Sequence, residues 1–132
     1  MRTKLFVAAA GLGLMLASVP AIAHHSFAAE FDAAKPIKLT GAVTKVEWMN
    51  PHTYFYIDVK DEKGTVTNWG LEMGSPNGLM RQGWTRNSMK IGDVVTVEGS
   101  AAKDGSNIGN ARSVTLAGGQ RLFAGSSQNT TP

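Results

Sequence analysis

The chain has 132 residues, a formal net charge of +3 and no cysteine. This length fits one small domain. The absence of cysteine excludes disulfides, thiol catalysis and zinc–thiolate sites, so stability has to come from a packed core. The sequence has no phosphate-binding glycine loop, dinucleotide fingerprint or EF-hand calcium loop, and no motif in it establishes a catalytic activity.

Residues 1–23 have the pattern of a cleavable secretory signal peptide. Two basic residues precede an uncharged apolar run over residues 5–19, and Ala21 and Ala23 supply the small side chains of an A-x-A cleavage site. A membrane anchor is the alternative, but a spanning helix needs about 20 apolar residues and this run is shorter and ends at a proline. We therefore expect cleavage before His24, export to the periplasm and no membrane anchor after cleavage.

Cleavage changes the charge balance of the domain. Removing 23 residues from 132 leaves 109, with 11 basic and 10 acidic side chains and a formal charge of +1. Nucleic-acid binding rests on a basic surface, so this balance argues against a nucleic-acid partner. A small ligand or an envelope protein is the partner that we expect.

The mature chain begins with a leader over residues 24–36, in which two phenylalanines four residues apart predict one helical turn before Pro36. The apolar pattern then predicts a first strand over residues 37–48. A change of phase between Val43 and Val46 predicts a bulge in a long, bent strand.

Residues 54–60 alternate most clearly as a strand. Its apolar side chains share one face: Phe55, Ile57 and Val59. A turn at residues 61–64, with glycine where positive φ is expected, leads into a returning strand over residues 65–73. The carboxylates of this hairpin, Glu72 among them, are expected in solvent.

Ser75 and Pro76 predict the start of one short helix. Four residues at helical spacing are expected on its buried side: Leu79, Met80, Gly83 and Trp84. Strands over residues 94–99 and 110–116 follow, with Val95 and Val97 facing the core. Residues 118–132, rich in small and polar side chains, predict a disordered tail.

The resulting order, β-β-β-α-β-β, is that of an OB-fold. We therefore predict an all-β domain with one short helix, arranged as a five-stranded OB-like Greek-key barrel over residues 37–117. A long, bent first strand fits this fold, because that strand has to belong to both sheets of the barrel.

Three segments also resemble a known family: residues 24–27 (HHSF), 48–52 (WMNPH) and 90–99 (KIGDVVTVEG). They are similar to segments of small exported proteobacterial proteins classed as a domain of unknown function. The resemblance covers roughly the whole mature domain. It implies an exported location and an OB-like β-barrel, and it brings no established activity.

The three histidines are the candidate metal ligands. Cleavage before His24 would free an amine beside an imidazole, a pair that can chelate a metal; His25 and His52 would add two more imidazoles. Nitrogen ligands suit Cu(II), Ni(II) or Zn(II), and a near-planar nitrogen set favours copper. A leader folded back along the first strand would reach His52, whereas a leader pointing away would not. In the alternative interpretation, these are ordinary terminal and turn residues.

Two further sets of side chains have alternative interpretations. Trp48, Tyr54 and Tyr56 are candidates for stacking against a ligand such as a glycan, although tyrosine also simply favours strands. The methionines of the mature domain are expected to fill the core rather than to bind Cu(I): Met49, Met73, Met80 and Met89.

The sequence thus favours a non-enzymatic periplasmic binding protein that holds a transition metal such as copper through His24, His25 and His52. One alternative is a copper-dependent oxidase with His24 as its N-terminal ligand. Another is a metal-free barrel that binds a glycan, a peptide or a protein.

Overall fold

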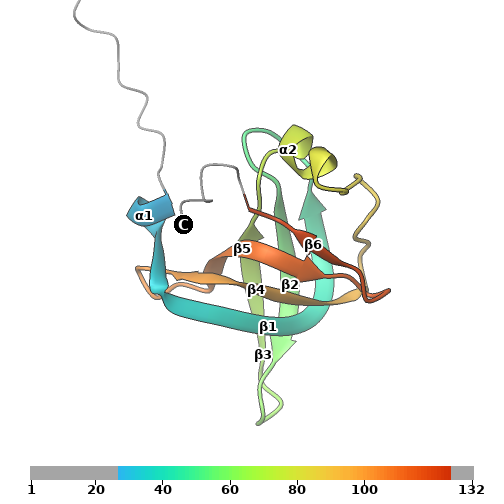
Figure 1. The fold of residues 1–132 in the computed structure, drawn as a ribbon. Coiled ribbons are helices and arrows are strands. Elements are labelled where there is room, and N and C mark those ends of the chain that lie inside the picture. The colour runs from blue at the N-terminus through green and yellow to red at the C-terminus, as the bar shows by residue number, and fades with distance from the viewer. Residues whose placement is uncertain (1–26, 126–132) are drawn as a thin grey trace, which may run out of the picture.

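The computed structural model describes residues 27–125 (Figure 1). The predicted signal peptide, His24 and His25, and residues 126–132 lie outside this range. The elements follow in chain order: α1 (Phe27–Glu30), β1 (Phe31–Glu47), β2 (Tyr54–Lys60), β3 (Val66–Glu72), α2 (Pro76–Arg81), β4 (Val94–Ala102), β5 (Ile108–Thr115) and β6 (Arg121–Phe123).

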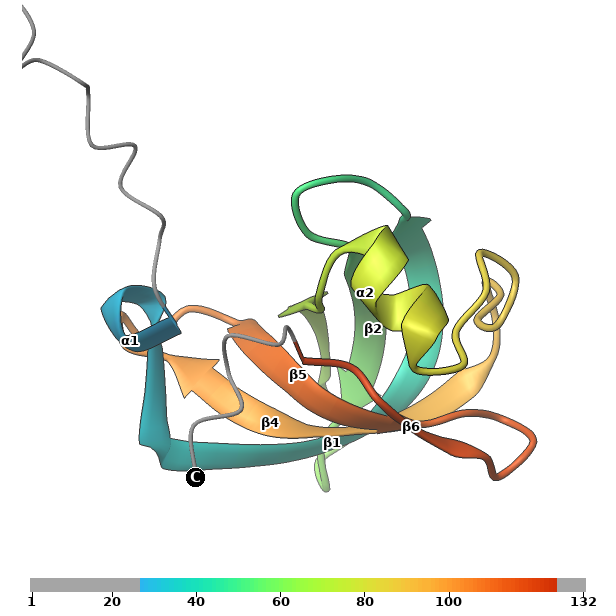
Figure 2. The ribbon, with the colours of Figure 1, turned by 45° about the horizontal axis from the view of Figure 1, so that its top comes forward.

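The strands form one sheet in the order β3-β2-β1-β4-β5-β6, and neighbours in this order are antiparallel. A further parallel pairing joins β3 to β5, with Leu71 opposite Gly109. This pairing closes five strands into a ring, and β6 extends the sheet beyond β5 (Figures 1 and 2). The described chain is therefore mostly β with a short helix between the third and fourth strands, as predicted. The strand β6 is additional, whereas α1 is the helical turn that was predicted before Pro36.

The first strand serves two neighbours and is strongly curved in both views (Figures 1 and 2). Its first part pairs with β4 and its second part with β2, and the two ladders overlap at Gly41 and Ala42. The predicted bulge is confirmed, because the register with β2 shifts between Val43 and Lys45. Gly41 permits a close approach of β1 and β2, since an added Cβ would collide with the carbonyl group of Asp58.

The structure differs from the leader predicted over residues 24–36. The helical turn exists as α1, and the rings of Phe27 and Phe31 lie 5.7 Å apart. However, the strand already begins at Phe31, so the leader is not a separate segment. Pro36 lies within β1, at a shift of register between Asp32 and Pro36. Proline is tolerated at such an irregularity because its missing N–H interrupts no regular ladder.

The structure also differs from the tail predicted over residues 118–132. Strand β6 pairs with β5, which places Leu122 opposite Val114, and Leu122 and Ala124 are buried. The residues around this strand are small or polar, so the sequence shows no strand pattern here. A segment this short becomes a strand because the edge of β5 offers it backbone partners.

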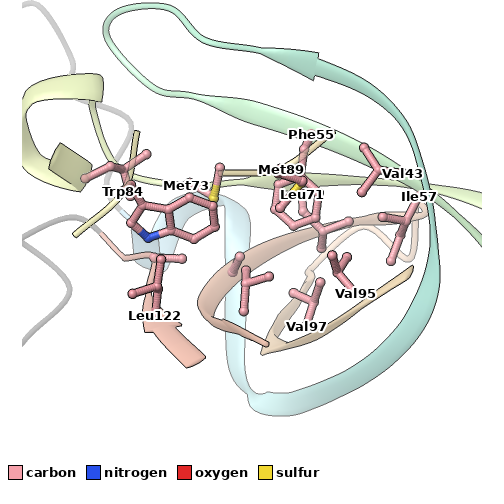
Figure 3. Packing of buried hydrophobic residues seen from close by; sticks show 14 residues of the cluster. Val43, Phe55, Ile57, Leu71, Met73, Trp84, Met89, Val95, Val97 and Leu122 are labelled. Carbon is pink, nitrogen blue, oxygen red and sulfur yellow. The ribbon is translucent and has the colours of Figure 1, made fainter. Parts of the chain in front are cut away.

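The core fills the inside of the ring (Figure 3). The predicted inward residues Phe55, Ile57, Val95 and Val97 are all buried there, and Val59 packs against them. Six further residues complete the set labelled in Figure 3: Val43, Leu71, Met73, Trp84, Met89 and Leu122.

The helix α2 starts as predicted, because the Ser75 side chain accepts a hydrogen bond from the backbone N–H of Gly78 at 3.2 Å. Its predicted buried side is wrong at Met80, which is 51% exposed, and at Gly83, which is also exposed. The helix ends at Arg81, so Trp84 does not continue its stripe. Gly83, with φ of 98°, turns the chain and brings Trp84 back to the core.

Candidate functional site

His52 lies in the loop that joins β1 to β2. The next residue, Thr53, is held on both sides: its N–H donates to the carbonyl oxygen of Gly74 at 3.0 Å, and its own carbonyl oxygen accepts from the N–H of Met73 at 2.8 Å. These two bonds join the loop to the chain just after β3. They therefore place His52 beside Glu72, the last residue of β3.

His52 and Glu72 are in direct contact. The distance from His52 Nδ1 to Glu72 Oε1 is 2.8 Å. Ionised carboxylate oxygens only accept hydrogen bonds, so Nδ1 carries the proton and donates it. In the neutral imidazole, Nε2 then keeps its lone pair. The His52 side chain is 35% exposed and that of Glu72 is 11% exposed. The arrangement is a buried carboxylate that holds a partly exposed imidazole.

Tyr54 holds the other oxygen of the same carboxylate. Its hydroxyl donates to Glu72 Oε2 at 3.1 Å, across the β2–β3 ladder in which Tyr54 and Glu72 are direct partners. Burial raises the pKa of Tyr54 well above its ordinary value, and the negative charge of Glu72 raises it further. Tyr54 therefore keeps its proton and donates a hydrogen bond over the whole physiological pH range. We call His52, Tyr54 and Glu72 the histidine cluster.

The electrostatics of the histidine cluster involve α1 as well. Burial raises the pKa of Glu72 above its ordinary value of 4.5; the charge of His52 and the Tyr54 hydroxyl lower it in part, and the charge of Glu30 raises it. Glu30 also contributes to the raised pKa of Tyr54. The carboxylate at the end of α1 thus acts on the same cluster as His52.

The start of α1 at Phe27 changes how much chain is available to connect His24 to the described domain. His24 and His25 lie outside the described residues, so their own positions are not part of the structure. His24 precedes Phe27 by three residues, and three residues span at most about 10 to 11 Å. The expected link between His24 and His52 therefore depends on this short segment before α1. It does not depend on a 13-residue leader folded back along a strand.

Tyr56 and Trp48, the other predicted ligand-binding residues, lie apart from these hydrogen bonds. Tyr56 is half-buried, with the Lys45 ammonium group 5.4 Å from its ring centroid. Its ring lies against Gly70, where an added Cβ would be 3.1 Å from Tyr56 Cε1. Trp48 packs against the core. Of the three aromatic candidates, Tyr54 alone is hydrogen-bonded within the histidine cluster.

Glu72 is the residue that sequence reasoning misplaced, since the carboxylates of the hairpin were expected in solvent. Asp61 behaves as expected, because its side chain accepts from the N–H groups of Lys63 and Thr65 in the turn. The feature of the sequence that indicates the position of Glu72 is the register of the hairpin. A turn at residues 61–64 places Tyr54 opposite Glu72, which predicts that the hydroxyl and the carboxylate meet.

Among residues 27–125, no group of three or more His, Cys, Asp or Glu side chains is arranged to hold a metal ion. No helix in this part of the chain is long and apolar enough to cross a membrane. Met73 and Met89 are buried in the core as expected, whereas Met49 and Met80 are exposed.

Comparison with known proteins gives a family but no activity. The model of a family of unknown function, DUF6152, matches residues 11–112. The prediction of a domain family of unknown function is thereby confirmed. No curated protein matches the chain.

Two solved structures are similar to part of the chain. One is the crystal structure of TiaS in complex with a tRNA and ATP, with 24% identity and a TM-score of 0.45, covering 61% of this chain and 18% of that one. The other is the ZRD-deleted mutant of TiaS in complex with agmatine, with 24% identity and a TM-score of 0.45, covering 74% of this chain and 24% of that one. The chain thus spans less than a quarter of either protein.

Proposed function

The chain belongs to the DUF6152 family, whose function is unknown, and we propose that it is an exported binding protein that holds one transition-metal ion, copper in the first place. His52 supplies one ligand, and His24 and His25 supply the others. Residues 1–23 direct the chain to the periplasm and are then removed.

The observation that carries this proposal is the contact between His52 and Glu72. Glu72 engages Nδ1 at 2.8 Å, so Nε2 is the nitrogen left for a ligand, on a side chain that is 35% exposed. Metal-binding histidines characteristically donate their other ring N–H to a carboxylate, which fixes the ring and raises the basicity of the ligating nitrogen. The pairing of His52 with Glu72 fits this pattern.

The N-terminal half of the site follows from processing. Cleavage before His24 frees an amine beside an imidazole, and this pair closes a chelate ring on a metal ion. With His25 and His52, the donor set is made of nitrogen atoms, which suits Cu(II).

The strand ring supplies the rigid support for the site. We take it to be an OB-like Greek-key barrel, with β1 shared between its two sides and α2 inserted after β3. The loop with His52 then emerges from the barrel between its first two strands. Its attachment to the chain after β3 holds the imidazole in place before a metal binds.

The decisive experiment changes the N-terminal amine and leaves every imidazole intact. Mature protein that starts at His24, verified by intact mass, is titrated with Cu(II) in competition with a chelator of known affinity. We expect one Cu(II) per chain. One alanine added before His24 should lower the affinity more than about tenfold, at least the loss seen when an outer-shell partner is removed. His52→Asn should have a similar effect.

Adventitious binding to histidines would give a different result. The added alanine would then leave the affinity unchanged, because all three imidazoles are still present. Affinity that is insensitive to either the added alanine or His52→Asn would refute the proposed function. Recovery of unprocessed chain from the inner membrane would refute the export step.

A further inference from the structure

We propose that Glu72 is a positioning residue that selects Nε2 of His52 as the metal-binding nitrogen, and that Tyr54 holds Glu72 in the orientation required. The inference rests on the proposed function for the metal. The tautomer of His52 that it requires is a property of the metal-free protein and is tested there.

Both ends of the contact between His52 and Glu72 have a fixed backbone. Glu72 pairs with Tyr54 on β2 and with Asn110 on β5, so strands on both sides hold it within the ring. His52 is followed by Thr53, whose N–H and carbonyl groups are both bonded to the chain after β3. The 2.8 Å contact between His52 and Glu72 therefore joins two anchored positions rather than two free surface chains.

Each carboxylate oxygen of Glu72 has its own hydrogen-bond donor. Tyr54 donates to Oε2 at 3.1 Å, and His52 donates to Oε1 at 2.8 Å. Rotation of the carboxylate is thereby opposed, since it would break both bonds. Glu72 is mostly buried, so solvent replaces a lost donor poorly, and an unpaired buried carboxylate oxygen is costly.

With Nδ1 committed to a carboxylate, the neutral imidazole has a single available lone pair, on Nε2, and the negative partner makes this nitrogen a stronger donor to a cation. Without Glu72, His52 is free to exchange between its two tautomers and to rotate. The affinity for a metal then falls because part of the population presents the wrong nitrogen or the wrong orientation.

The test begins with the tautomer of His52 in metal-free protein. Nitrogen-15 NMR, with His52 assigned by comparison with His52→Asn, is recorded on the metal-free protein and compares the signals of the two ring nitrogens. We expect protonated Nδ1 and unprotonated Nε2. A dominant Nε2–H tautomer in the unaltered protein would overturn the inference, and this measurement needs no folded variant.

The second measurement compares matched variants. Glu72→Leu removes the acceptor, whereas Glu47→Leu removes a carboxylate that is opposite Tyr54 on β1 and pairs with Lys45 instead of His52. We expect that His52 exchanges between its two tautomers in Glu72→Leu and that the Cu(II) affinity falls about 10- to 100-fold. Glu47→Leu should leave both properties unchanged. Tyr54→Phe should give a smaller loss of affinity.

The outcomes separate the two proposals. If His52→Asn leaves the copper affinity unchanged, the proposed function fails whatever the tautomer is. If His52→Asn weakens binding and Glu72→Leu does not, His52 is a ligand and the positioning role of Glu72 is refuted.

Discussion

The indole N–H of Trp84 donates to the carbonyl oxygen of Phe123 at 2.9 Å. This bond joins the chain just after α2 to the end of β6. The last described strand is thereby attached to the segment that carries Trp84 into the core. Leu122 belongs to the same labelled cluster in Figure 3. Strand β6 is therefore part of the folded domain.

A chain that ends after Ala117 should be less stable than one that ends after Gly125. The first truncation removes β6 with the buried Leu122. It therefore loses the stabilisation of about 1.5 to 3 kcal/mol that burial of one such side chain provides. The second removes only residues 126–132 and serves as the control. Urea unfolding of both chains measures the difference. Equal midpoints and slopes would show that β6 adds nothing to stability.

The substitution Ile57→Asp should unfold the domain. Ile57 is fully buried, and an unpaired buried charge costs several kcal/mol against a total stability of about 5 to 15 kcal/mol. Val66→Asp is the matched control, because Val66 lies on the same hairpin and is exposed. Its effect should be within about 0.5 kcal/mol. Circular dichroism and urea unfolding check both variants, and a fully stable Ile57→Asp variant would contradict the core described above.

The substitution Thr53→Val should stabilise the domain by about 1 kcal/mol. The Thr53 hydroxyl is buried and has no hydrogen-bond partner among residues 27–125, and such a group carries a penalty of about 1 to 3 kcal/mol. Thr40→Val is the control, since the Thr40 hydroxyl is paired with that of Thr96 at 2.9 Å near the surface. That change should not stabilise the protein. A lower melting temperature for Thr53→Val would show that the hydroxyl has a favourable partner.

In metal-free protein, Glu72 should make stability depend on pH. Burial raises its pKa in the folded state, so the folded chain keeps the Glu72 proton to a higher pH than the unfolded chain does. Between these two pKa values the unfolded state has fewer bound protons, so stability falls as pH rises. The stabilising contribution of this group is complete below its unfolded pKa and is lost as pH rises through the folded one.

Glu72→Gln removes this titration and nearly preserves the shape of the side chain. The free energy of unfolding of the variant, minus that of the unaltered protein, should therefore increase with pH from about 4.5 upwards and then level off. Denaturant titrations at several pH values measure this difference. A difference that decreases with pH would mean that the folded-state pKa of Glu72 is lowered.

The sequence by itself determined the parts of this protein that depend on local pattern. The alternation at Phe55 and Ile57 defined a strand and its buried face, because side chains point to opposite faces with a period of two. Gly64 adopts positive φ, as the predicted turn requires, and Ser75 caps α2. Each of these features is decided by residues within a few positions of one another.

The tertiary structure decided the rest. Leu122 is buried because the edge of β5 accepts a short strand, which the polar residues around it do not signal. Glu72 is buried because β3 pairs with β2 on one side and β5 on the other, and because the loop after β1 places His52 over its carboxylate. The histidine cluster joins residues from a loop and two strands through a pairing of distant segments. Its burial, and hence the raised pKa of Glu72, arises only when the ring closes.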